Sequence, residues 1–256
     1  MTEQAQHPIV KALDSLVDVR ESLSEYARSN PNDVGGRFAG YCAANFMGSQ
    51  AQLFQDLLVV FFLKGRRNGF FVEFGATDGV GLNNTLVLER NFQWTGILAE
   101  PAACFHAALK ANRKAAIDTR CVWSASGERL DFVETQIPEL STVSTLAGND
   151  QHKEARSRNT RTYAVETVSL NDLLAAHDAP REIDYLSVDT EGSEPAILKA
   201  FDFSRYDVKI ATVEHNYIEP NRGEVHALMT ANGFLRLMEP ISKFDDWYIK
   251  RAVLGL

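Results

Sequence analysis

The feature that most constrains the fold is an alternation of short apolar runs with helix-like stretches, which begins near residue 69. Continuous apolar strands that alternate with helices are typical of a parallel sheet covered by helices on both faces. The predicted strands are 70–74, 95–99, 120–123, 183–188 and 209–213, and the predicted helices between them are 86–92, 102–112, 170–177 and 194–201. The sequence therefore predicts an α/β fold.

The two ends of the chain add further elements to this pattern. A predicted helix at 224–232 leads to strands at 234–238 and 247–249, and the lack of a helix between them predicts an antiparallel pair at the sheet's edge. Near the N-terminus, apolar residues recur at helical spacing over 8–28. We therefore expect an N-terminal helical extension, residues 1–48, that caps a site or makes a homodimer contact, followed by a larger domain, residues 49–256.

Two shorter segments add to the larger domain. Residues 129–134 alternate in polarity after Gly127 and predict a hairpin, and residues 50–64 favour a helix. The polar segment 138–162 carries several basic residues. Long loops in compact domains are often lids or binding loops, so we expect 138–162 to be a mobile substrate loop.

Composition excludes several classes of function. The chain has 256 residues with 34 acidic and 26 basic side chains, a net charge of −8, which speaks against nucleic-acid binding. Its longest apolar run, 57–63, is far shorter than the roughly 20 residues of a membrane-spanning helix. The first ten residues lack the basic start and apolar stretch of a signal peptide, so we expect a cytoplasmic location.

A glycine turn follows the first predicted strand and indicates a ligand site. Gly75 lets the backbone approach a ligand closely, but Thr77 stands where a dinucleotide fingerprint needs its second glycine. The nearby acids Glu73 and Asp78 suit a cationic or amino-bearing ligand better than a diphosphate. Glu100, after the second strand, can accept both hydroxyls of a ribose, but nicotinamide enzymes use the same logic, so an NAD-dependent oxidoreductase stays open.

Four segments together resemble one family. They are Val-Glu-Phe-Gly-Ala-Thr-Asp-Gly at 72–79, Asn84-Thr85, Glu100-Pro101, and Asp-Tyr-Leu-Ser-Val-Asp-Thr-Glu-Gly-Ser-Glu at 184–194. This combination resembles the FkbM family of S-adenosylmethionine-dependent methyltransferases. Residues 52–56 are similar to a Ser-Gln-x-x-Gln-Asp box of that family, with Ala51 where serine is usual. The resemblance covers roughly residues 50–250 and implies a Rossmann-like, seven-stranded methyltransferase sheet with a reversed last strand.

The resemblance also implies a cofactor site for S-adenosylmethionine. Asn84 and Thr85 would lie at a helix N-terminus beside the methionine carboxylate, and Glu100 would hold the ribose. Ser124 or Ala125, after the predicted third strand, would flank the adenine. The full implied set is Glu73, Gly75, Ala76, Asp78, Gly79, Asn84, Thr85, Glu100, Pro101, Ser124, Ala125 and Asp189.

Acidic residues follow the fourth and fifth predicted strands, at 189–194 and 214–216. Because these parallel strands end at one edge of the sheet, both groups can reach the cofactor's methyl group. A hydroxyl acceptor must lose its proton, and two routes fit: a general base, His215, Asp189 or Glu191, or a magnesium ion held by Asp189, Glu214 and Asn216. Some O-methyltransferases of related fold bind a metal at these strand ends. Glu194 also suits the first turn of the next helix, where the dipole favours acids.

We therefore predict an S-adenosylmethionine-dependent O-methyltransferase that acts on a hydroxyl of a sugar, glycan or related small molecule, as in polysaccharide biosynthesis. The sugar acceptor follows from the resemblance alone. Two alternatives stay open: an NAD-dependent Rossmann oxidoreductase, and a non-catalytic module that binds cofactor or glycan.

Overall fold

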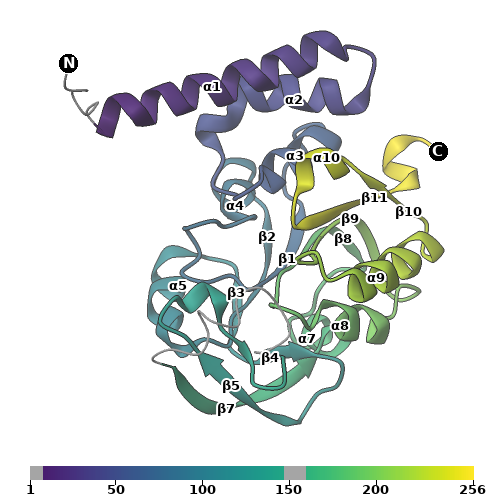
Figure 1. Ribbon diagram of the computed structural model, residues 1–256. Helices are drawn as coiled ribbons and strands as arrows, with labels where there is room; N and C mark the ends of the chain where they lie inside the picture. The colour runs from purple at the N-terminus through teal and green to yellow at the C-terminus, as the bar shows by residue number, and fades with distance from the viewer. Residues whose placement is uncertain (1–7, 147–159) are drawn as a thin grey trace. The chain divides into compact units, whose positions relative to one another are not determined.

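The computed structural model describes residues 8–146 and 160–256 (Figure 1). The chain forms two compact units, Met1–Ser49 and Gln50–Leu256. Within the described residues, no helix combines the length and apolarity needed to cross a bilayer.

The N-terminal unit is a pair of packed helices. Its elements are α1 (Pro8–Ser29), α2 (Val34–Asn45) and the 3₁₀ helix η1 (Phe46–Gly48). Asp33 caps α2, because its side chain accepts hydrogen bonds from the N–H groups of Gly35 (3.0 Å) and Gly36 (3.4 Å). A Cβ on Gly36 would lie 1.9 Å from the carbonyl oxygen of Asn30, so the helix turn needs glycine there. The predicted helix at 8–28 is confirmed, whereas the three glycines of α2 give its sequence a low helix propensity, so the sequence does not predict that helix.

The larger unit is built on a seven-stranded sheet. The strand order is β10-β11-β9-β8-β1-β2-β3, and only β11 runs antiparallel to its neighbours. The strands are β1 (Phe70–Phe74), β2 (Thr95–Ala99), β3 (Ala116–Asp118), β8 (Glu182–Val188), β9 (Asp207–Glu214), β10 (Phe234–Leu237) and β11 (Asp245–Lys250). The predicted α/β sheet with a reversed last strand is confirmed, and the reversed strand lies inside the edge, between β9 and β10.

Helices cover both faces of this sheet. Because side chains alternate along a strand, Val72 and Phe74 of β1 point to one face and Phe71 to the other. The first face packs on α7 (Leu170–Ala176), α8 (Glu194–Ala200) and α9 (Glu219–Ala231), which lie together on one side of the sheet in Figure 1. On the other face, the Arg113 guanidinium after α5 lies 5.6 Å from the Phe71 ring centroid.

The remaining helices of this unit are short. They are α3 (Gln55–Phe62), α4 (Leu86–Phe92), η2 (Ala103–Phe105), α5 (His106–Asn112), η3 (Pro138–Leu140), α10 (Glu239–Ser242) and η4 (Arg251–Leu254). Of these, α3 and α4 pack on each other.

A second, four-stranded sheet has the order β4-β7-β5-β6. Its strands are β4 (Cys121–Trp123), β5 (Arg129–Glu134), β6 (Thr142–Val143) and β7 (Arg161–Ser169). The prediction that 120–123 is the third strand of the main sheet is wrong. The short β3 takes that place beside β2, while β4 pairs with β7. The sequence does not predict β3, because three residues are too few to show a strand pattern.

The predicted hairpin strand at 129–134 forms β5, which pairs antiparallel with the next strand, β6, and on its other side with β7, about thirty residues further along the chain. The segment expected to be one loop, 138–162, is more structured than predicted. It includes η3 and β6, and its last two residues belong to β7. Residues 147–159 of that segment lie outside the described residues.

Candidate active site

A cavity of about 340 Å³ opens at the edge where β1, β2, β8 and β9 end. Small-molecule sites have volumes of roughly 300–1,000 Å³, and this edge is where open α/β sheets bind ligands. The lining comes from the turn after β1, the end of β2, strand β4, the 138–143 segment and the turns after β8 and β9. Residues distant in sequence therefore meet around one space.

Gly75 is required by the close approach of two strand ends. Its φ is +68°, and a Cβ there would lie 2.3 Å from the carbonyl oxygen of Asp189. The glycine that the sequence singles out thus lets the turn after β1 pack directly against the turn after β8.

Four other residues of the cavity lining also have a left-handed backbone. Thr77 (φ +49°), Leu82 (φ +54°), Glu191 (φ +58°) and Asn216 (φ +44°) are not glycine, so each conformation carries strain. Such strain gathers at functional sites, where the surrounding structure holds it in place. Here it turns four side chains toward the cavity.

Glu100 lies at the end of β2 with both carboxylate oxygens engaged. It accepts hydrogen bonds from the N–H groups of Thr77 (2.8 Å) and Ala102 (2.7 Å). Burial raises the pKa of this carboxyl from 4.5 to about 7, even though these hydrogen bonds lower it. Since an ionised carboxylate offers about four lone-pair positions, two remain for a ligand's hydroxyl groups.

Glu73 is a support beneath the turn rather than part of the cavity lining. Its oxygens accept hydrogen bonds from the Asn83 side-chain amide (3.0 Å) and the Asn84 N–H (2.9 Å). The Asn83 side-chain oxygen Oδ1 in turn accepts from the N–H groups of Thr85 (3.0 Å) and Leu86 (2.8 Å). The helix N-terminus expected to bind a carboxylate thus has two of its N–H groups already occupied.

The predicted cofactor residues therefore fall into two groups. Gly75, Glu100, Pro101 and Asp189 line the cavity, whereas Glu73, Ala76, Asp78, Gly79, Asn84 and Thr85 are not among its lining residues in the described structure. In the second group, the Asn84 side-chain amide donates to the Ser187 hydroxyl (2.9 Å).

The predicted adenine residues Ser124 and Ala125 follow β4 and do not line the cavity among the described residues. Ser124 is exposed. The wall at this end is formed by Phe105, Cys121, Val122 and Phe132.

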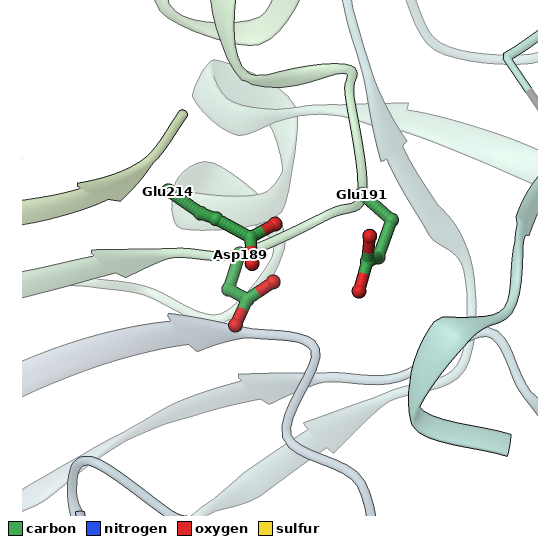
Figure 2. A group of neighbouring side chains, drawn as sticks. All are labelled: Asp189, Glu191 and Glu214. Atoms are coloured by element: carbon green, nitrogen blue, oxygen red, sulfur yellow. The ribbon is translucent and has the colours of Figure 1, made fainter. Parts of the chain in front are cut away.

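Three carboxylates meet at the other end of the cavity. Oxygens of Asp189, Glu191 and Glu214 all lie within 4.8 Å of one another, and Figure 2 shows the three side chains converging. Asp189 and Glu214 follow or end β8 and β9, as the sequence predicts, and Glu191 lies with them. Asn216 lines the same cavity, and its amide donates to Glu191 at 3.4 Å.

Two members of this acidic cluster, Asp189 and Glu214, lie in a part of the cavity whose described lining contains no lysine, arginine or histidine. The Glu214 Oε2 atom is buried without a hydrogen-bond partner among the described residues. Burial and mutual repulsion raise the pKa of both Asp189 and Glu214 well above their ordinary values. The cluster is therefore an energetically costly arrangement that a bound cation would stabilise.

Comparison with known proteins identifies the family. A family model described as the methyltransferase FkbM domain matches residues 73–236, more than half of the chain. The chain belongs to the FkbM methyltransferase family. No curated protein sequence matches it. Among solved structures, it is similar to a precorrin-6y C5,15-methyltransferase from Geobacter metallireducens GS-15, with 11% identity, 71% of each chain covered and a TM-score of 0.36.

His215 of this FkbM domain lies away from the main cavity. Its Nδ1 accepts a hydrogen bond from the Tyr217 N–H (3.0 Å), and its Nε2 lies 3.7 Å from an oxygen of Asp246. The ring borders a separate small cavity with Arg222 and Asp246, and burial lowers its pKa. His215 thus follows Glu214 in the sequence, but it is not among the described residues that line the main cavity.

Glu194 closes the turn before α8. One of its oxygens accepts hydrogen bonds from the N–H groups of Thr190 (2.9 Å) and Gly192 (3.1 Å). It lies in the first turn of α8, as expected, and its contacts fix the loop that carries Asp189 and Glu191.

The box at 51–56 of the FkbM domain braces the acidic end. The Gln55 amide donates to Asp245 (2.8 Å), whose strand β11 pairs with the end of β9. The Asp56 carboxylate accepts from the N–H groups of Gln50 (2.9 Å) and Ala51 (3.4 Å). Because Ala51 uses its backbone, the missing serine does not affect this contact. Gln52 lines the cavity.

Proposed function

We propose that this FkbM methyltransferase uses S-adenosylmethionine and transfers the methyl group to a hydroxyl of a sugar, glycan or related small molecule. The observation that supports it is one cavity with a ribose-suited carboxylate, Glu100, at one end and the acidic cluster at the other. The O-methyl and saccharide parts follow from the family resemblance.

The cavity fits the parts of this cofactor. The apolar wall of Phe105, Val122 and Phe132 suits a flat adenine ring. Glu100 has acceptor capacity left for the two ribose hydroxyls. The acidic end suits a ligand that carries sulfonium and ammonium charges. When bound, S-adenosylmethionine supplies an activated methyl group, so the protein's task is to place the acceptor and take up its proton.

The acidic end also fits a divalent metal. Asp189, Glu191 and Glu214 would hold a hard cation such as magnesium, with Asn216 beside Glu191. The unpartnered Glu214 oxygen supports this, because a metal would supply the partner that the described chain does not. Such an ion would lower the pKa of an acceptor hydroxyl.

In this proposal, the chain's own residues position the acceptor and accept its proton. A carboxylate of the cluster is the better candidate for a general base than His215, because the cluster lines the cavity and the imidazole does not. The strained backbone at Glu191 and Asn216 holds both side chains at the site before a ligand arrives.

Calorimetry tests this proposal with S-adenosylmethionine, S-adenosylhomocysteine and NAD as ligands, with and without magnesium. We expect both sulfur compounds to bind, and NAD not to bind. Binding of NAD alone would support the oxidoreductase instead, and binding without methyl transfer to any saccharide in an acceptor screen would support a non-catalytic module.

A metal-dependent reaction has its own test. If the metal route holds, a chelator abolishes turnover and added magnesium restores it. Full activity in chelator would exclude the metal route and leave a carboxylate of the cluster as the general base.

The N-terminal unit remains a predicted cap or homodimer contact.

A further inference from the structure

Arg113 is a buried arginine that no sequence motif singles out. It follows α5 directly, and its side chain is fully enclosed. A buried guanidinium is costly unless its donors and its charge are satisfied, so its contacts indicate what it holds.

Its donors converge on the segment that follows β1. Nη1 donates to the Asn83 side-chain oxygen Oδ1 (2.9 Å) and to the Gly79 backbone carbonyl (3.4 Å), and Nη2 donates to the Thr85 hydroxyl (2.8 Å). The planar guanidinium of arginine can donate to these acceptors at once in a fixed geometry, whereas a lysine ammonium is a point charge on a flexible stem.

The contact between Arg113 and this segment is close-packed as well as polar. A Cβ on Gly79 would lie 2.5 Å from the Arg113 Cγ, so the turn rests directly on the arginine stem. The preceding residue adds a second hold, because the Asn112 side-chain amide donates to the Asp78 carbonyl (2.8 Å). The end of α5 therefore contacts the segment after β1 at Asp78, Gly79, Asn83 and Thr85.

Two carboxylates balance the charge. Arg113 Nε donates to Glu89 (3.3 Å), and Nη1 lies 3.9 Å from Glu73. Burial raises the pKa of Glu73, and the nearby guanidinium opposes this rise. Arg113 thus supplies a positive charge beside the carboxyl group beneath Asn83 and Asn84.

The inner side of the same turn lines the cavity through Thr77, Gly81 and Leu82. At the start of α5, a ring nitrogen of His106 lies 2.8 Å from the Glu100 carbonyl oxygen. The short helix α5 therefore spans from the ribose-suited end of the site to the turn after β1.

We propose that Arg113 is a positioning residue for the amino-acid half of the cofactor: it fixes the outer side of the 77–85 turn so that the inner side keeps its binding shape. This inference rests on the proposed use of S-adenosylmethionine at the same cavity. In the described structure, Arg113 contacts neither the Glu100 side chain nor the apolar wall, and only the Thr77 N–H connects the turn to Glu100, so we expect the loss of Arg113 to affect the amino-acid half more than the ribose and adenine.

The test compares two ligands on the same protein. Arg113→Lys keeps a positive charge near Glu73 and removes the planar guanidinium. By calorimetry, we expect its affinity for S-adenosylhomocysteine to fall about tenfold, the effect of losing roughly one hydrogen bond, while its affinity for methylthioadenosine, which lacks the amino acid, changes less than about twofold. Lys110→Arg, an exposed change on the same helix, is the control and keeps both affinities.

Asn112→Ala gives a second, milder test that does not depend on Arg113→Lys folding. It removes only the hydrogen bond to the Asp78 carbonyl, and we expect a loss of about threefold for S-adenosylhomocysteine alone. Equal loss for both ligands, or no loss, would overturn the inference while leaving the proposed function standing. If the unchanged protein binds neither ligand, the proposed function fails and the inference falls with it.

Discussion

Two regions beside the cavity give their buried carboxylates opposite kinds of partner. Beneath the turn after β1, Glu73 is surrounded by hydrogen-bond donors and lies near Arg113. At the ends of β8 and β9, Asp189 and Glu214 face other acids. Both regions are buried, so the difference lies in the partners that the chain supplies.

This difference separates support from reactivity. A buried acid with its donors in place holds a turn in one shape, and its removal damages the fold. Acids that repel one another in a buried site cost stability, and such an arrangement persists when it serves a ligand or a reaction. Variants of either region test this difference, because the paired acid should matter for stability and the clustered acids for turnover.

The largest effect is expected at the acidic end, on turnover. Asp189→Asn removes a charge from the cluster while keeping its size, and we expect methyl transfer to fall by about 10²–10⁴-fold, the range for loss of an acid–base group. Radioactive methyl transfer measures it once an acceptor is found. S-adenosylhomocysteine should still bind, and turnover near the unchanged rate would remove Asp189 from the reaction.

In the region around Glu73, the next largest effect is on stability. Arg113→Met leaves Glu73 buried without its cation and several acceptors without donors, so we expect the free energy of unfolding to fall by about 3–5 kcal/mol. Urea denaturation measures this loss. A change below about 1 kcal/mol would show that the two regions do not differ as described.

Glu100 should make the affinity for the cofactor depend on pH. Because its pKa is raised to about 7 and ribose hydroxyls bind the ionised form better, cofactor affinity should weaken as the pH falls below 7. Calorimetry at pH 6 and pH 8 should show a difference of up to about tenfold. Glu100→Gln should bind more weakly at pH 8 and lose this pH dependence, and a retained dependence would assign it to another group.

The pH dependence of stability has a sign that the raised pKa values determine. Glu100 and Asp245 have folded-state pKa values of about 7, above the values of about 4 expected when unfolded, so the folded state binds more protons between these limits. Their contribution to stability is therefore greatest below pH 4 and is lost as the pH rises toward 7. Where the unchanged protein and Asp245→Asn both stay folded, the variant should show a smaller fall in melting temperature from pH 5.5 to 7.5. An unchanged slope would contradict this assignment.

The smallest expected effect is a gain in stability at the acidic end. Glu214→Gln removes one of the carboxylates that repel one another, so we expect the free energy of unfolding to rise by about 1 kcal/mol in the absence of divalent metal. The same measurement with magnesium should give the opposite sign if the cluster binds the metal. Destabilisation in metal-free buffer would show that the cluster is already balanced.

The sequence by itself determined the elements whose signals are local. The run 70–74, the glycine at 75 and the acids at 100, 189 and 214 could be placed because strand, turn and strand-end positions follow from neighbouring residues. The seven strands of the main sheet and the reversed β11 agree with the family resemblance.

Tertiary structure decided everything that depends on contacts between distant segments. The short β3 displaced β4 from the main sheet, and a left-handed backbone at Glu191 brought that side chain to Asp189 and Glu214. Arg113 reaches the 79–85 turn only because α5 packs back against it. No local pattern contains such information, because burial, charge pairing and backbone strain are set by residues that meet only after the chain has folded.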